Sequence, residues 1–220
     1  MNGTRDEALQ EFVDALRSAF VVALGSTPAM RVFQSSLFQA LAKSESAGIQ
    51  RAANLPVCAH LPSTIQSAMM SAPEVGRLAT AFEKIAPKLT WKVRSSSGPH
   101  ASESWLAGHA NVVIIGPGGI EERSDISIGA SLLAPHVRYP DHSHPPEELY
   151  LVLTSGRFQH ASDDWFEPGP GGLFHNTPGI KHAMASDDQP LLAFWCLKTP
   201  TGGAEAGPLD HIDTPMKTTS

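Results

Sequence analysis

The stretch YPDHSHPPEELY, residues 139–150, combines two histidines and two glutamates with both tyrosines of the chain. Side chains alternate between the two faces of an extended strand, so His142 and His144 are expected on the same face. Glu148, four residues beyond His144, reaches that face as well if the strand continues or turns gently. His182, in the segment PGIKH at residues 178–182, lies far enough downstream to stand on another strand.

These four side chains form a candidate metal site. Three imidazoles and one carboxylate make a mixed nitrogen and oxygen donor set, which suits zinc, iron(II), manganese or nickel. The alternative is a group of surface histidines in a polar loop, since the chain has ten histidines. The spacing of the acid and the later histidine favours the metal, so we predict that His142, His144, Glu148 and His182 bind one divalent transition metal.

Composition sets the broad class. The chain has 220 residues, of which 41% are hydrophobic and 17% are charged, with a net charge of −6. This describes a globular protein and argues against nucleic acid or an anionic membrane as a partner. Its two cysteines, Cys58 and Cys196, are far apart and indicate no disulfide framework. Because the N-terminal residues lack a signal pattern, we expect a cytoplasmic protein.

The first part of the chain, residues 1–100, is expected to be a helical segment. Apolar residues recur every three to four positions over residues 6–24, which is typical of an amphipathic helix. Similar patterns predict a second helix around residues 32–41 and a third over residues 62–85, ended by Pro87.

The second part, residues 101–199, has the character of an antiparallel β-structure. Short alternating or apolar runs are separated by Gly- and Pro-rich turns, which indicates a sandwich or a small barrel. The expected strands cover residues 111–115, 125–132, 148–153, 156–160, 172–175 and 191–197. Residues 200–220 are expected to form a loosely ordered tail. The predicted fold class is therefore α+β, with a C-terminal double-sheet β-barrel preceded by an N-terminal helical segment.

The pattern of His142, His144 and Glu148, then Gly156, Gly172, Pro178 and His182, resembles the two cupin motifs. Cupins are double-sheet jelly rolls, and the resemblance implies a metal inside the barrel. The first motif is slightly longer and the second slightly shorter than usual, and Ser186 stands where asparagine is common. These departures affect the loops and leave the ligand types unchanged.

Within the cupins, the chain is similar to the dimethylsulfoniopropionate lyases, in particular the longer subgroup with an N-terminal helical extension. That family carries one tyrosine three residues before the first motif histidine and another two residues after the motif glutamate, which Tyr139 and Tyr150 match. The resemblance implies cleavage of a small zwitterion, dimethylsulfoniopropionate, to dimethyl sulfide and acrylate.

The two tyrosines suit a β-elimination. The proton next to the substrate carboxylate is weakly acidic, and a metal on that carboxylate stabilises the charge that develops. A tyrosine has an ordinary pKa of about 10 and must be poised as phenolate to act as the base, for which a nearby dication is the obvious device. Our hypothesis is that Tyr139 is the base and that Tyr150 contacts the metal or the carboxylate. The alternatives are that the two roles are reversed or that both tyrosines are barrel-wall residues.

Further residues have expected roles around this centre. Trp195 and Phe194 follow on a later strand and are candidates to bind the sulfonium, because cations bind aromatic faces; the alternative is a place in the core. His175 is a candidate to support a metal ligand. The remaining histidines without partner signatures, His60, His100, His109 and His211, are expected in solvent.

Two other functions use the same motifs. A cupin dioxygenase or isomerase acting on another small carboxylate would need the same histidines and glutamate, because fold does not fix function. A non-catalytic cupin that binds a small molecule is the second. The tyrosines favour elimination, and the acidic N-terminal helices give no support to a nucleic-acid regulator. The oligomeric state is left open, with a homodimer as one option.

Overall fold

The computed structural model describes residues 5–94 and 102–198. Two helices form near the expected places, α1 at Glu7–Val22 and α2 at Pro28–Leu41. Asp6 caps α1, because its carboxylate accepts a hydrogen bond from the Leu9 backbone N–H at 3.2 Å. Thr27 caps α2 in the same way through Met30, and Pro28 occupies the first turn, where its missing N–H costs nothing.

The third expected helix is divided in two. The structure has α3 at Leu61–Met69 and α4 at Pro73–Ile85, joined by a short turn. Pro73 has no N–H to donate and its ring blocks a continuing helix, so it begins α4. The prediction of one helix over residues 62–85 is therefore wrong. The remaining helical elements are η1 at Pro56–His60, η2 at Ala86–Lys88 and α5 at Glu103–Gly108.

Within residues 102–198, eight strands form two antiparallel sheets. The larger sheet has the order β1-β2-β8-β4-β6 and the smaller one the order β3-β7-β5. The bounds are β1 His109–Ile115, β2 Ile126–Leu133, β3 Arg138–His142, β4 Glu147–Val152, β5 Arg157–His160, β6 Leu173–Asn176, β7 His182–Ala185 and β8 Leu191–Lys198.

The motif stretch does not form one continuous strand. It ends β3 at His142, turns through residues 143–146 and begins β4 at Glu147, in the other sheet. Pro145 and Pro146 lie in this turn, where prolines without an N–H cannot continue a hydrogen-bonded ladder. Pro140, on the edge strand β3, accompanies a register irregularity against β7. Of the two expected courses, a continuing strand or a turn, the chain takes the turn, and the side chains of His144 and Glu148 lie 3.1 Å apart.

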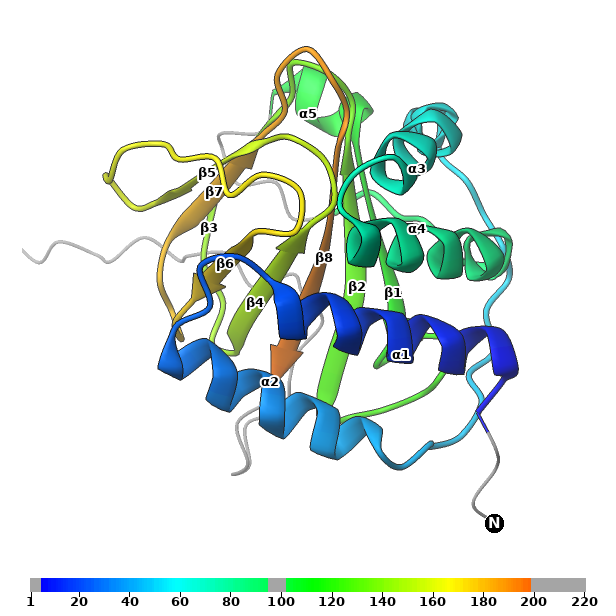
Figure 1. The fold of residues 1–220 in the computed structure, drawn as a ribbon. Helices are drawn as coiled ribbons and strands as arrows, with labels where there is room; N and C mark the ends of the chain where they lie inside the picture. Colours follow the sequence, from blue (N-terminus) through cyan, green and yellow to red (C-terminus); the bar gives the residue numbers. More distant parts are fainter. Residues whose placement is uncertain (1–4, 95–101, 199–220) are drawn as a thin grey trace, which may run out of the picture.

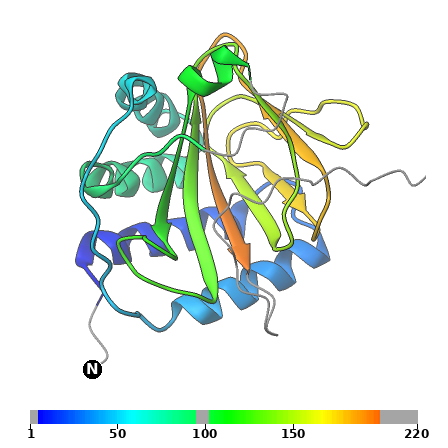
Figure 2. The same cartoon turned by 180° about the vertical axis from the view of Figure 1, so that it is seen from behind.

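The five-stranded sheet is buried on both faces. Figures 1 and 2 show the helices α1, α2 and α4 covering one face, while the three-stranded sheet lies toward the other. On the helix side, Phe194 of β8 packs its ring edge-on to Phe12 of α1 and Phe82 of α4, with centroids at 5.2 and 4.9 Å. Helices and sheet therefore share one large hydrophobic core. A second, smaller core fills the space between the two sheets.

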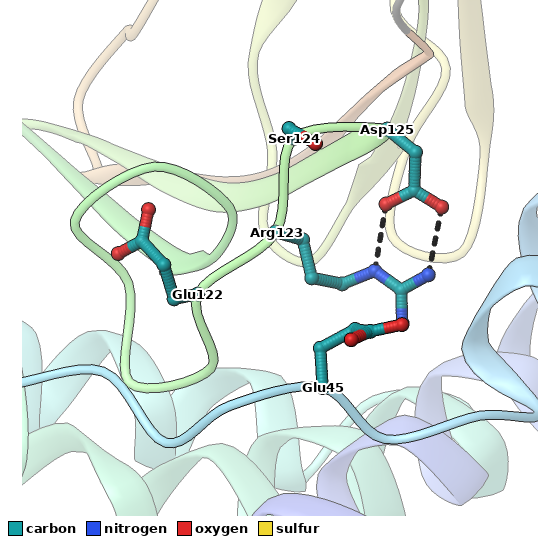
Figure 3. A pocket seen from close by; sticks show the side chains of 5 residues that line it. All are labelled: Glu45, Glu122, Arg123, Ser124 and Asp125. Atoms are coloured by element: carbon teal, nitrogen blue, oxygen red, sulfur yellow. Dashed lines mark hydrogen bonds and ion pairs between the residues drawn. The ribbon is translucent and has the colours of Figure 1, made fainter.

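A buried charge network ties the chain before α1 to the loop between β1 and β2. Arg5 Nε donates to Glu121 Oε2 at 2.6 Å, and Arg123 contacts the same carboxylate at 3.3 Å. Figure 3 shows the paired hydrogen bonds from Arg123 to Asp125, at 2.8 and 2.7 Å, in a surface pocket of about 340 Å³. Because Arg5 and Arg123 also donate to the Lys43 carbonyl at 3.2 and 2.7 Å, the network fixes the end of α2 as well.

Two expected boundaries cannot be compared with the structure. The division between residues 1–100 and 101–199 falls within residues 95–101, and the tail 200–220 falls within residues 199–220, both outside the described residues. Within residues 5–94 and 102–198, no helix combines the length and apolar character needed to cross a bilayer.

Candidate metal centre and active site

The three motif histidines gather between the two sheets. His142 ends β3 and is the register partner of His182, which begins β7, while His144 reaches them from the turn before β4. One ring nitrogen of each residue can be chosen so that all three lie within 4.8 Å of one another. Residues far apart in the sequence are thus brought together by the pairing of β3 with β7.

The ring orientation of each histidine is fixed by the backbone. Nδ1 of His142, His144 and His182 lies 2.9, 2.9 and 3.0 Å from a backbone carbonyl two residues away. A carbonyl can only accept, so Nδ1 donates a proton to it, and Nε2, when deprotonated, is the nitrogen that offers its lone pair to a metal. This arrangement is typical of metal-binding histidines, whose second ring nitrogen is held by a backbone or carboxylate acceptor.

Glu148 lies across the interior, on β4. Its Oε2 is 3.1 Å from Nε2 of His144 and 3.2 Å from Nε2 of His182. Burial alone would raise the pKa of Glu148, but His144 and His182 hold that pKa well below its ordinary value. Burial alone would lower the pKa of His144, but the negative charge of Glu148 outweighs burial and raises that pKa. The carboxylate is therefore kept ionised in the interior.

The donor set fits a divalent metal. First-row metals bind imidazole and carboxylate at about 2.0–2.2 Å, which places neighbouring ligand atoms about 3–3.5 Å apart. The separations of Glu148 Oε2 from the two imidazoles match this spacing. His182 Nε2 is buried and makes no hydrogen bond, and its contact with Glu148 Oε2 at 3.2 Å brings together two atoms that a metal between them would satisfy. The cluster can therefore hold a metal ion.

Two further side chains support Glu148, and the sequence pattern missed them. Asn176 of β6 is fully buried and its Nδ2 donates to Glu148 Oε2 at 2.7 Å. His160 Nε2 in turn lies 2.9 Å from Asn176 Oδ1. His175, the expected supporting residue, instead contacts Glu147 at 2.7 Å, because alternation along β6 turns it away from Asn176 and the interior. The signal in the sequence that could have indicated Asn176 is its spacing of two residues from Phe174, which places both side chains on the inward face of β6.

Tyr139 lies on β3 beside the histidines, with its ring centroid 4.9 Å from that of His142. Its hydroxyl receives two N–H donors, Asn111 Nδ2 at 3.2 Å and Arg94 Nη1 at 3.4 Å. The Asn111 amide is oriented by Ser131, which donates to Oδ1 at 2.6 Å. Burial raises the pKa of Tyr139 above its ordinary value, and Arg94 and Asn111 offset only part of this rise. Two donors on one phenol oxygen favour the phenolate.

The Tyr139 ring is held by a wall of aromatic residues. Trp105 of α5 and His109 stack face to face at 4.2 Å, and both meet the Tyr139 ring edge-on, at 5.4 and 5.5 Å. His109 is fully buried, so the expectation that it is solvated is wrong. Burial lowers the pKa of His109 and favours the neutral ring. Its Nδ1 donates to the Trp105 carbonyl at 2.5 Å.

Tyr150 has a different environment. It lies on β4 and faces the interior, two residues beyond Glu148. Burial raises the pKa of Tyr150 well above its ordinary value, and the negative charge of Glu148 raises it further. The two tyrosines therefore differ electrostatically: Tyr139 meets N–H donors and Tyr150 meets a carboxylate.

The two aromatic candidates on β8 lie on opposite faces. Trp195 is the register partner of Tyr150 and belongs to the inner core. Gly129, its partner on β2, leaves room for the indole, since a Cβ there would collide with the Trp195 ring. Phe194 packs among Phe12 and Phe82 on the helix side. The expectation that Phe194 lines the same pocket as Trp195 is wrong, because neighbours on a strand point in opposite directions.

Two antiparallel sheets that enclose a histidine cluster, preceded by helices, define the class of protein as a cupin, as predicted. The chain belongs to the dimethylsulfoniopropionate (DMSP) lyase family, whose family model matches residues 29–193. One curated relative is "Putative dimethylsulfoniopropionate lyase DddL" of Cereibacter sphaeroides, 29% identical over 133 residues. This match covers 60% of the chain and 54% of the relative, so the chain spans about half the length of that protein.

Solved structures agree on the fold. The crystal structure of the DMSP lyase DddQ from Ruegeria pomeroyi DSS-3 superposes with a TM-score of 0.67 at 20% identity, over 92% of this chain and 100% of that one. A structure from the crystallographic work on the DMSP lyases RdDddP and RnDddQII gives 0.67 at 22% identity, over 91% and 95%. At these identities the likeness establishes a shared architecture.

Proposed function

We propose that this protein is a metal-dependent carbon–sulfur lyase that cleaves DMSP to dimethyl sulfide and acrylate by β-elimination. Family membership supports the substrate, since the relative's name and the neighbouring structures refer to DMSP lyases. The observation that carries the mechanism is the Tyr139 hydroxyl, which receives two N–H donors beside the histidine cluster. An elimination needs a general base, and donors on the phenol oxygen stabilise the phenolate form that would act as one.

His142, His144, Glu148 and His182 would hold one divalent transition metal. When bound there, the metal supplies Lewis acidity to the substrate carboxylate and makes the neighbouring proton easier to remove. The backbone carbonyls at Nδ1 and the Asn176 amide at Glu148 fix these side chains before the metal arrives, which lowers the cost of organising them.

Tyr139, as phenolate, takes the proton from the carbon next to the carboxylate. The electron pair of that C–H bond forms the new C=C bond, and the pair of the C–S bond leaves with sulfur. Dimethyl sulfide and acrylate are released, and Tyr139 ends as the neutral phenol. Asn111 and Arg94 stabilise the phenolate because both donate to its oxygen.

Tyr150 and Trp195 would complete the site. Tyr150, next to Glu148, would touch the metal or the substrate carboxylate. The indole of Trp195, in the inner core, would offer a π-face to the sulfonium cation. Phe194 has no role in this proposal, since it lies in the helix-side core.

Headspace gas analysis tests the proposal. Metal-loaded protein mixed with DMSP should release dimethyl sulfide together with an equal amount of acrylate, measured by chromatography. Chelated protein and the Tyr139→Phe variant serve as controls and should release little. Full metal loading without dimethyl sulfide would reject the lyase function and favour a dioxygenase, an isomerase or a binding role.

A further inference from the structure

Arg94 places a positive charge next to the candidate base without an acidic partner among residues 5–94 and 102–198. Its Nη1 lies 3.4 Å from Tyr139 Oη, and its guanidinium carbon lies 5.9 Å from the Tyr139 ring centroid. Arg94 Nε is buried and has no hydrogen-bond partner. A buried guanidinium donor without an acceptor is costly, so the position favours a ligand that brings an anion.

The backbone at Arg94 is fixed. Its N–H donates to Nε2 of His109 at 3.0 Å, and His109 is held by the Trp105 carbonyl and by stacking on the Trp105 ring. Because Nδ1 of His109 donates, Nε2 is the acceptor, and both ring nitrogens are used to position Arg94. The backbone from which the Arg94 side chain extends is therefore held in place beside β1, on the same side as the inner core.

The guanidinium of Arg94 also lies near the metal cluster. Its carbon lies 5.9 Å from the centroid of the Tyr139 ring, and that ring lies 4.9 Å from the ring of His142. A small anion bound between Arg94 and the cluster would therefore be stabilised by positive charge from both sides.

We propose that Arg94 is a substrate-binding residue that receives the carboxylate of the substrate. This inference rests on the proposed lyase function and specifies its substrate class: zwitterions with a carboxylate at one end and a soft cation at the other. A guanidinium offers a planar pair of donors that matches a carboxylate. With the carboxylate at Arg94, the adjacent carbon lies near Tyr139 Oη and the sulfonium points on toward the inner core.

Propionate and propionamide are the probes, because they have nearly the same shape and differ in charge. Their inhibition constants are measured with metal-loaded wild type, Arg94→Gln and Lys92→Gln. Lys92→Gln removes the same charge from an exposed position two residues away. In Arg94→Gln we expect propionate to bind about 10- to 100-fold more weakly, as for loss of a charged hydrogen bond, and propionamide to bind unchanged. Lys92→Gln should change neither.

Arg94→Lys keeps the charge and loses the planar pair of donors. We expect propionate to weaken less than in Arg94→Gln, which separates binding from a purely structural role. Should Arg94→Gln fail to fold, the ratio of propionate to propionamide binding in Arg94→Lys decides the question. The inference is wrong if that ratio stays at its wild-type value, or if both ligands weaken equally.

Calorimetry separates this inference from the lyase function. Propionate binding to metal-loaded protein is measured directly and needs no turnover. If the protein releases no dimethyl sulfide but binds propionate in an Arg94-dependent way, the proposed lyase reaction is wrong and the anion site at Arg94 is supported. If the protein cleaves DMSP but its binding of propionate does not depend on Arg94, the lyase reaction is supported and the role of Arg94 in carboxylate binding is wrong.

Discussion

The two faces of the five-stranded sheet differ in what they contain, and β8 shows the difference in adjacent residues. Phe194 points toward the helices, into a core of apolar side chains around Phe12 and Phe82. Trp195 points the other way, into a smaller interior that also holds both tyrosines. One strand thus contributes to stability with one residue and to the candidate site with the next.

The helix layer explains how the inner face can be polar. A buried Leu or Phe side chain contributes about 1.5–3 kcal/mol, and most of the large buried side chains lie on the helix side. The interior can therefore bury Glu148, Asn176 and His182, which would be costly without partners. Asn176 donates to Glu148 Oε2 at 2.7 Å, and His182 Nε2 lies 3.2 Å from the same oxygen, at the candidate metal position.

The largest effect on the inner face is expected from removing ligands. Combining His144→Ala with His182→Ala should lower bound metal from about one per chain to near zero, because two of the three imidazoles are lost. Elemental analysis of purified protein measures this. His175→Ala is the matched control, since His175 pairs with Glu147 away from the cluster. An unchanged metal content in the double variant would show that these histidines do not bind the metal.

The next largest effect separates the two tyrosines. Tyr139→Phe removes only a hydroxyl and should lower kcat about 10²- to 10⁴-fold, as for loss of a general base, with the metal still bound. Tyr150→Phe should lower kcat less, because Tyr150 faces Glu148 and lacks the donors that favour a phenolate at Tyr139.

The measurement for both tyrosine variants is steady-state release of dimethyl sulfide, with exchange of the hydrogen next to the carboxylate followed by NMR. Exchange and release should disappear together in Tyr139→Phe. Near-normal turnover in both variants would contradict the elimination mechanism, and a larger loss in Tyr150→Phe would reverse the assignment of the base.

The sequence predicted most of the helices and strands because their periodicity is local. It placed His142, His144, Glu148 and His182 together through motif spacing, although Glu148 lies on a different sheet from His142. Arg94 and Asn111 were missed, because their proximity to Tyr139 comes from pairing of the chain near Lys92 with β1 and from packing across the barrel. No local pattern encodes contacts between residues so far apart in the chain.

Phe194 shows a second limit of the sequence. An aromatic pair on a strand offers two candidates, and alternation says only that they point in opposite directions. The side that faces the site depends on which face the helices cover. The packing of α1 and α4 against β8 decides that Phe194 faces the helices and that Trp195 faces the interior.

A pair of alanine variants tests the two faces of β8 directly. Phe194→Ala should lower the free energy of unfolding by about 3–5 kcal/mol, because it opens a cavity among packed rings, and leave KM nearly unchanged. Trp195→Ala should raise KM for DMSP more than it lowers kcat, since binding of the sulfonium cation to the ring is lost.

Urea unfolding and steady-state kinetics, measured on both variants, give the two readouts. The two faces have separate roles if the free energy of unfolding falls more in Phe194→Ala and KM for DMSP rises more in Trp195→Ala. A Trp195→Ala variant with an unchanged KM and a folding defect would place Trp195 among core residues only.

The smallest expected effect lies on the helix side, at Glu121. Burial alone would raise the pKa of this carboxyl, but Arg5, and more weakly Arg123, hold it below its ordinary value. A depressed folded-state pKa contributes stability that is present above the unfolded value of about 4.3 and is lost as pH falls through the folded one. The acid limb of the stability curve should therefore be steeper in wild type than in Glu121→Gln.

Urea midpoints between about pH 6 and pH 3 measure that slope, with Glu122→Gln as the control that removes the same charge from the adjacent exposed position. The slope is the relevant quantity, because Glu121→Gln also lowers stability at neutral pH by leaving Arg5 and Arg123 without their shared carboxylate. Equal slopes in wild type and Glu121→Gln would mean that acid sensitivity arises elsewhere. Glu148, a second buried carboxylate whose pKa is held low, would then be the first candidate, and the inner face would limit stability in acid.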